Sequence, residues 1–172
     1  MLKSKKKLSA LLMTVMTLML AGVAGLAQRH FMLANARRPE VNVLLSGAVE
    51  RDAKLMPLEK STVVKPGEIL DWNIAGENTG NATALEYKTI GHIPRGTEFV
   101  AGSAKADGAK ALYSIDGGKS FFAQPMIEVK QDDGSVKRVP APVSMYTEIR
   151  YEWSDPLAQG GKLFASYKVR VK

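Results

Sequence analysis

Apolar and polar residues alternate along most of the chain after residue 40, a period of two that is typical of half-buried β-strands. The clearest run closes the chain, where apolar positions at Leu163, Ala165, Tyr167, Val169 and Val171 alternate with Lys162, Ser166, Lys168, Arg170 and Lys172. Phe164 alone interrupts the polar face. The pattern predicts a strand over residues 162–172 with one buried and one solvated face.

The same alternation predicts several more strands, and from residue 40 onward no run has convincing helical spacing. Strong candidates lie at 147–153, 70–74, 85–89 and 41–45, and weaker ones at 98–100, 109–115, 126–130 and 136–139. We expect these strands to form two antiparallel sheets packed face to face. Trp72 and Trp153 are the expected anchors of the core.

Turn-forming residues separate the predicted strands. Pro66-Gly67 within 65–68 is typical of a type II turn, because Pro fixes φ and Gly accepts a positive φ. Residues 78–81, 116–118 and 131–135 suit hairpin connections.

The first 36 residues have a different character. A basic start at 1–7 is followed by the uncharged segment 8–27, which as a helix would be about 30 Å long at 1.5 Å per residue. Small residues suited to a signal peptidase follow, at 25–27 and at 34–36. This order predicts a secretory signal helix cleaved after Ala36 or after Ala27. The alternative is an uncleaved membrane anchor formed by residues 8–27.

Charge and composition exclude several classes of protein. The chain of 172 residues has 24 Lys and Arg against 17 Asp and Glu, a net charge of +7, and no Cys. Without Cys there is no disulfide framework, thiol nucleophile or thiolate metal site. Five of the basic residues lie in 1–36, where no acid occurs, so the remainder has a net charge of only +2. The basic balance therefore gives little support to nucleic-acid binding.

These features predict three parts in the chain. Residues 1–36 form the signal peptide or anchor, 37–61 an N-terminal strand and its connection, and 62–172 the β-sandwich, with 37–61 packing as part of the same domain.

Residues 62–171 also resemble a known family. The motifs that carry the resemblance are the Pro-Gly-Glu turn at 66–68, the Asn-Thr-Gly turn at 78–80, Ile-Pro-Arg-Gly-Thr-Glu-Phe-Val at 93–100 with Ala-Gly-Ser at 101–103, and the later segments 113–121, 149–153 and 156–157. In this order they resemble a single copy of the conserved-repeat domain of unknown function numbered eleven. Gln159 departs from the family, which usually has Pro at this position, directly before the glycine that is Gly160 here. The resemblance implies an immunoglobulin-like β-sandwich in an exported or cell-envelope protein, and it implies no catalytic residues.

One motif is shared with an unrelated class of hairpin. Residues 114–121 fit the Asp-box pattern Ser-x-Asp-x-Gly-x-Ser-aromatic, which occurs on the hairpins of sialidase propellers. A propeller needs many such hairpins, so one copy favours a local role. We expect Asp116 to cap the turn, Gly117 and Gly118 to take positive φ, and Phe121 to pack beneath.

Other candidate sites have simpler interpretations. Asp132 and Asp133 offer too few oxygens for calcium and favour a solvated hairpin turn. His92 has no partner at a catalytic spacing and is expected in a turn. Asn81-Ala82-Thr83 fits a glycosylation acceptor but more simply belongs to its Asn-rich turn.

Two surface features could bind a ligand. Lys162, Lys168, Arg170 and Lys172 form a basic stripe on the last strand. This stripe could contact an anionic polymer or membrane, although a solvated outer face or a lysine-guarded edge explains it more simply. Phe121, Phe122 and Phe164, if exposed together on one face, would favour a glycan- or peptide-binding module.

The sequence therefore predicts an all-β, immunoglobulin-like antiparallel β-sandwich preceded by an N-terminal hydrophobic signal helix. The expected function is a non-enzymatic structural or protein-interaction module, exported to the periplasm or cell surface. Its expected partner is an envelope protein or a cell-wall polymer, with no nucleic acid, and with membrane contact only through an uncleaved N-terminal segment. The alternative is a soluble ligand-binding module. No catalytic, cofactor-binding or metal site is predicted.

Overall fold

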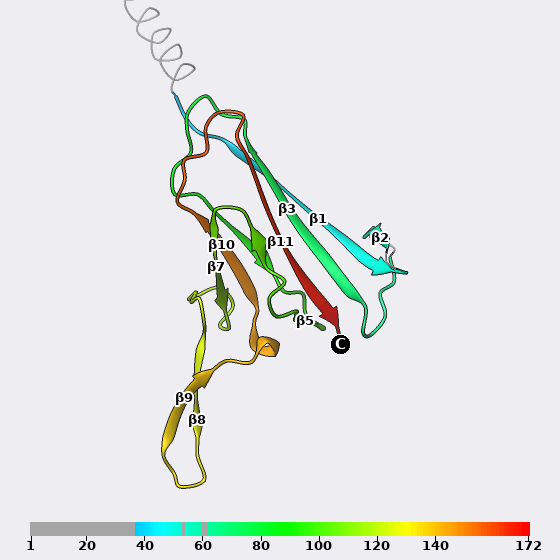
Figure 1. Cartoon of the computed structure of the whole chain (residues 1–172), viewed down its shortest axis with the longest axis vertical. Coiled ribbons are helices and arrows are strands. Elements are labelled where there is room, and N and C mark those ends of the chain that lie inside the picture. Colours follow the sequence, from blue (N-terminus) through cyan, green and yellow to red (C-terminus); the bar gives the residue numbers. More distant parts are fainter. Residues whose placement is uncertain (1–36, 53, 60–61) are drawn as a thin grey trace, which may run out of the picture. The chain divides into compact units, whose positions relative to one another are not determined.

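The described chain is an all-β protein in which two antiparallel sheets form a β-sandwich (Figure 1). The computed structural model describes residues 37–52, 54–59 and 62–172, so the predicted signal helix lies outside the described residues. The larger sheet has six strands in the order β2-β1-β3-β11-β5, with β6 also paired to β11. The smaller sheet has the order β4-β10-β7, and β8 and β9 form a separate hairpin. The predicted all-β fold with antiparallel sheets in a β-sandwich is confirmed.

The strands are β1 (Val41–Arg51), β2 (Lys54–Pro57), β3 (Ile69–Asn78), β4 (Lys88–His92), β5 (Thr97–Phe99), β6 (Lys105–Ala106), β7 (Ala109–Ser114), β8 (Met126–Lys130), β9 (Val136–Pro140), β10 (Glu148–Trp153) and β11 (Lys162–Val171). One 3-10 turn, η1 (Val143–Met145), precedes β10. The predicted strands at 147–153, 162–172 and 70–74 agree with β10, β11 and the first half of β3.

The core lies between the sheets, where alternate side chains of β3, β10 and β11 meet. Tyr151 and Tyr167 are fully buried, and each satisfies its hydroxyl by donating to a backbone carbonyl at 2.7 Å, of Ser166 and His92 respectively. Burial raises the pKa of Tyr167 to about 12. Trp153 is a core residue, as predicted, whereas Trp72 packs against the core only partly buried. The buried cluster consists of Val49, Leu70, Ile74, Ala84, Phe99, Ile149, Tyr151, Trp153, Leu157, Leu163, Ala165, Tyr167 and Val169.

The turn that precedes β3 has the predicted type II geometry. Gly67 has a φ of 89°, which favours glycine, and the Glu68 N–H donates to the Lys65 carbonyl at 3.1 Å. The 131–135 turn also agrees with its prediction, since it joins β8 to β9.

Two local predictions are wrong. Residues 78–81 do not connect a hairpin, because β3 and β4 belong to different sheets and the segment crosses between them. The predicted strand at 85–89 begins only at Lys88, because Glu86 has a φ of 49°, which breaks the extended backbone. Strands β2 and β6 were not predicted, since four and two residues are too short to show alternation.

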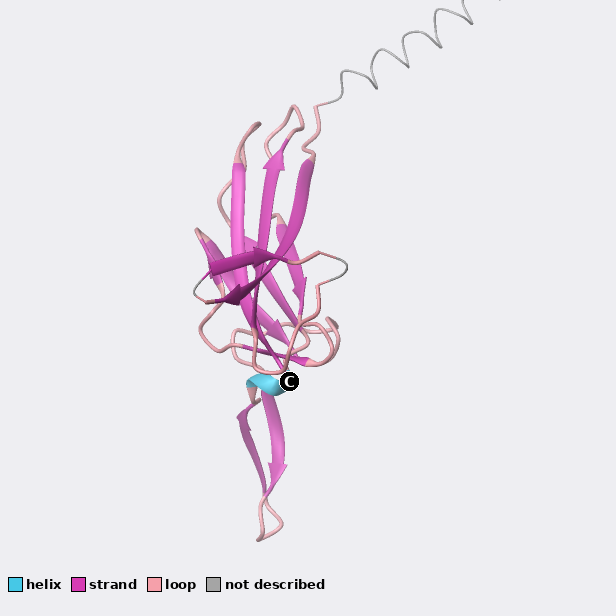
Figure 2. Ribbon diagram, turned by 90° about the vertical axis from the view of Figure 1, so that its right-hand side faces the viewer, coloured by secondary structure: helices cyan, strands magenta, loops and turns pink. Residues whose placement is uncertain are grey.

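The β8–β9 hairpin extends away from both sheets, below η1 (Figure 2). At its base the Ala141 N–H donates to the carbonyl of Pro125, which is fully buried. Most of its strand residues are exposed, and only Ile127 and Val139, which face each other, are partly buried.

Candidate functional surfaces

The Asp-box loop is held together by Asp116, as predicted. Oδ1 of Asp116 accepts hydrogen bonds from the Ser114 hydroxyl at 2.7 Å and from the N–H groups of Lys119 at 3.1 Å and Ser120 at 3.0 Å. Oδ2 accepts from the Ser120 hydroxyl. These bonds, led by that of Ser120, lower the pKa of Asp116 well below its usual range. Every Asp116 bond is used inside the loop, so the capping role accounts for its carboxylate.

The two glycines of this loop also agree with the prediction. Gly117 and Gly118 have φ values of 71° and 82°, and the Gly117 N–H donates to the Thr147 hydroxyl at 3.2 Å. A side chain at Gly118 would collide with the Glu148 carboxylate. The loop is therefore fastened to the start of β10.

Phe121 packs against Arg150 of β10, whose guanidinium carbon lies 4.2 Å from the centre of the phenylalanine ring. Arg150 also forms an ion pair with Glu152, with 2.8 Å between Nη2 and Oε1. Phe121 is thus partly buried by a cation–π contact, while its neighbour Phe122 is 55% exposed and bridges to Tyr113 of β7.

His92 is the last residue of β4, so its expected place in a turn is wrong. Its side chain is 76% exposed, and its Nδ1 lies 3.2 Å from Glu148 Oε1. Within the described ranges, no group of three or more His, Asp or Glu residues is arranged to hold a metal ion.

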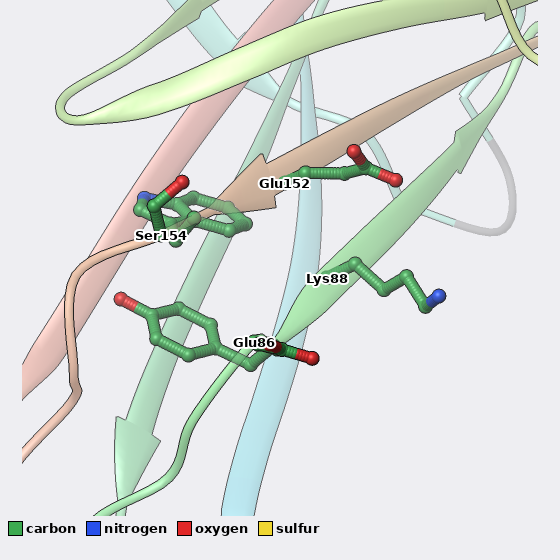
Figure 3. Close-up of a pocket in the computed structure, with 6 residues that line it drawn as sticks. Glu86, Lys88, Glu152 and Ser154 are labelled. Carbon is green, nitrogen blue, oxygen red and sulfur yellow. The ribbon is translucent and has the colours of Figure 1, made fainter.

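A small hollow lies at the ends of β4 and β10, with a volume of about 370 Å³. Its lining includes Glu86, Lys88, Glu152 and Ser154, and Figure 3 shows Lys88 and Glu152 extending from neighbouring strands. The rings of Tyr87 and Trp153 stack on each other, with centroids 5.3 Å apart, so they cover one another's faces. Glu86, Lys88 and Glu152 give the lining of this hollow both negative and positive charges.

The outer face of the larger sheet carries an apolar row across three strands. Leu44 of β1, Ala75 of β3 and Phe164 of β11 are directly opposite one another in the register. Leu44 is 68% exposed and Phe164 is 60% exposed. Shallow hollows lie on both sides of Phe164, one lined also by Leu44 and the other by Lys105 and Ala106.

The predicted basic stripe lies on this same outer face. It does not guard an edge, because β11 is an inner strand between β3 and β5. Lys168 pairs with Glu50 at 3.4 Å and with Asp71 at 3.5 Å, whereas Lys162 and Arg170 are exposed. The solvated-face interpretation fits this arrangement.

The hairpin turn at 132–135 is solvated, as predicted. The Asp133 carboxylate accepts from both the hydroxyl and the N–H of Ser135, at 2.6 and 2.9 Å, and these bonds lower its pKa. The carboxylate thus stabilises the turn of the hairpin.

Polar contacts hold both ends of β1, and sequence reasoning missed them. Oδ1 of the fully buried Asn78 accepts from the Glu40 N–H at 3.1 Å, and Asn81 Oδ1 accepts from the Arg38 N–H at 2.8 Å. At the other end Arg51 Nε donates to Glu68 at 2.7 Å. Asn81 therefore has the structural role expected of its turn, and the apolar alternation of β1 gave no sign of these anchors.

Comparison of the chain with models of protein families, with curated proteins and with solved structures gave no match. The resemblance of residues 62–171 to the conserved-repeat domain therefore stays a prediction. In the part of the chain that the structure describes, no helix is long and apolar enough to cross a membrane.

Proposed function

We propose that this protein is an exported, non-enzymatic component of the cell envelope that acts as a structural or protein-interaction module. The sequence supports export through the basic start, the uncharged segment 8–27 and the small residues that follow it. The sandwich supports an interaction role, because a rigid β-framework presents loops and hairpins to partners.

The observation that carries the proposal is the β8–β9 hairpin. An isolated two-stranded hairpin is at best marginally stable in water, yet this one extends beyond the sheets (Figure 2) with Met126 37%, Val129 37% and Val136 61% exposed. By register, Met126 and Val136 share one face, with Glu128 paired to Arg138 between them. A partner that covers this face would bury apolar area and further stabilise the hairpin.

The experiment is a cross-linked pull-down from intact cell envelopes with the full chain, tagged at its C-terminus. We expect capture of an envelope protein or wall polymer, and loss of most of that capture when Met126 and Val136 are both replaced by Ser. Leu85→Ser is the matched control, because Leu85 is 69% exposed but lies outside the hairpin. Recovery of neither protein nor wall material would contradict the proposal.

Export is tested separately by fractionation and mass spectrometry of the mature N-terminus. A start after Ala36 or after Ala27 supports cleavage, and a start at Met1 in the membrane fraction supports the anchor. A start at Met1 in the cytoplasmic fraction would contradict export.

A second candidate function is binding of a glycan or peptide on the outer face of the larger sheet. The observation that favours it is the exposed Phe164 ring between two shallow hollows. Phe164 and Phe122 belong to elements of different sheets, so they do not form the shared aromatic face that would have favoured this candidate further. Titration with wall-glycan fragments, compared between the natural chain and Phe164→Ser, would test this candidate.

A further inference from the structure

One edge of the larger sheet is open along the first half of β1. This strand pairs with β3 from Val41 to Val49, but on its other side it pairs with β2 only from Ala48 onward. In the described chain, residues 41–46 therefore have no strand beside them on that side. The feature is separate from the hairpin that supports the proposed function.

The direction of the backbone groups along this edge follows from two hydrogen bonds. The Glu40 carbonyl accepts from the Thr79 N–H at 2.8 Å, on the β3 side, and the Gly47 carbonyl accepts from the Leu58 N–H at 2.8 Å, on the β2 side. Backbone groups alternate in direction along a strand. Val41, Val43 and Leu45 therefore present their N–H and C=O groups to the open edge.

This edge lacks the features that usually prevent strand addition. Residues 41–47 contain no charged residue and no proline, and Val43 and Leu45 are each 50% exposed. The rest of the same edge, β2, begins with Lys54 and ends with Pro57, both of which discourage pairing. An open, neutral and apolar edge is a template for another strand.

We propose that a second copy of this chain pairs with this edge, antiparallel to it, about a twofold axis at Val43. Leu58 occupies the position beside Gly47, so an added strand can extend only to Ser46. The residues whose backbone groups point to the open edge must also lie opposite each other. Centring on Val43 satisfies both conditions. It pairs Val43 with Val43 and Val41 with Leu45, in about six hydrogen bonds.

The side chains and charges fit this self-pairing. On the face shared with the core, Val43 meets its own copy and Leu45 meets Val41, which continues the apolar layer across the junction. On the outer face Leu44 lies opposite Asn42, and Glu40 lies opposite Ser46. No like charges are opposed, and the same patch serves both copies, as a twofold interface requires.

The register is tested by disulfide cross-linking of the full chain, which contains no cysteine of its own. Asn42→Cys and Leu44→Cys chains, each with a different tag, are co-expressed and oxidised in intact cells with copper phenanthroline. We expect the mixed 42–44 dimer in several-fold excess over the 42–42 and 44–44 dimers, because residues 42 and 44 form a close, non-hydrogen-bonded pair. Leu85→Cys, at an exposed position outside both this edge and the hairpin, measures random collision.

A charge variant tests the same axis independently. Val43→Lys is introduced into both the Asn42→Cys and the Leu44→Cys chain. It places two lysines directly opposite each other, so it should lower the yield of the mixed 42–44 dimer at least tenfold. Leu44→Lys is the matched control, tested by chemical cross-linking of primary amines in otherwise natural chains. It places lysine opposite Asn42 and should retain the dimer.

Every outcome of the cross-linking decides the proposal. Preferred 42–44 dimers that Val43→Lys abolishes would support it. No excess over Leu85→Cys, a different preferred pair, or cross-links to another polypeptide with none between copies would overturn it. None of these results depends on capture through the hairpin, so they can fail independently of the proposed function.

Discussion

Strands β1 and β11 flank β3 in the larger sheet, and both alternate in sequence, yet only β11 is buried along one whole face. Its inward residues Leu163 and Val169 are 3% and 0% exposed, whereas Val43 and Leu45 of β1 are each 50% exposed. The difference arises from the opposite layer. A side chain at Gly91 of β4 would meet the Tyr167 ring at 2.5 Å, so the smaller sheet lies against β11. Alternation thus identifies a strand, but the facing layer decides its burial.

The two strands are also held in different ways. Strand β11 is fixed by apolar packing, with Tyr167 and Val169 in the centre of the core. Strand β1 is held at its start by Asn78 and at its end by Arg51 and Glu68, with Val49 as its one fully buried side chain. A strand held at its ends can keep its middle exposed.

The largest expected difference comes from truncating matched leucines. Leu163→Ala should lower the free energy of unfolding by about 2–5 kcal/mol, because it leaves a cavity in the core. Leu45→Ala should cost less than about 1 kcal/mol, because half of that side chain is already in water. Chemical denaturation of the full chain at low protein concentration, where self-pairing is weakest, compares the two. Equal losses would contradict the difference between the strands.

The second-largest effect should come from removing the polar anchor at the start of β1, Asn78. Asn78 Nδ2 donates to the carbonyls of Ala82 at 2.8 Å and Leu157 at 2.9 Å, and its Oδ1 accepts from Glu40. Asn78→Ala leaves these buried groups unpaired and should cost about 1–3 kcal/mol. Hydrogen exchange should then show earlier opening of β1 than of β11. Asn73→Ala, an exposed position of the same strand, is the control and should have little effect.

The sequence predicted what depends on local pattern. Alternation located β10 and β11, and the Pro66-Gly67 pair gave the turn before β3. Alternation could not show that the smaller sheet leaves most of β1 uncovered, because burial depends on contacts distant in sequence. For the same reason the open edge at Val43 and the buried role of Asn78 were missed. Asp116 was predicted because its partners are within four residues.

The anchor at the end of β1 should depend on pH. The hydrogen bond from Arg51 lowers the pKa of Glu68 from its ordinary 4.5 to about 2. A carboxylate with a lowered pKa stabilises the fold above pH 4.5 and loses that contribution as the pH falls from 4.5 toward 2. The gap in unfolding free energy between the natural chain and Glu68→Gln should therefore shrink over this range. Unfolding curves at several pH values test this, with Glu77→Gln on β3 as the control.

The smallest expected effect is at Phe164, the apolar residue that interrupts the polar face of β11. It lies on the same strand as Tyr167 but points to the opposite side of the sheet, where it is 60% exposed. Replacing it with Ser removes little buried area, so the free energy of unfolding should change by less than about 0.5 kcal/mol. Phe99→Ser is the matched control, since Phe99 is 3% exposed and should cost several times more. A large loss at Phe164 in thermal unfolding would mean that its ring is covered in solution. The outer face would then be buried like the inner one, and the contrast between the two faces of β11 would disappear.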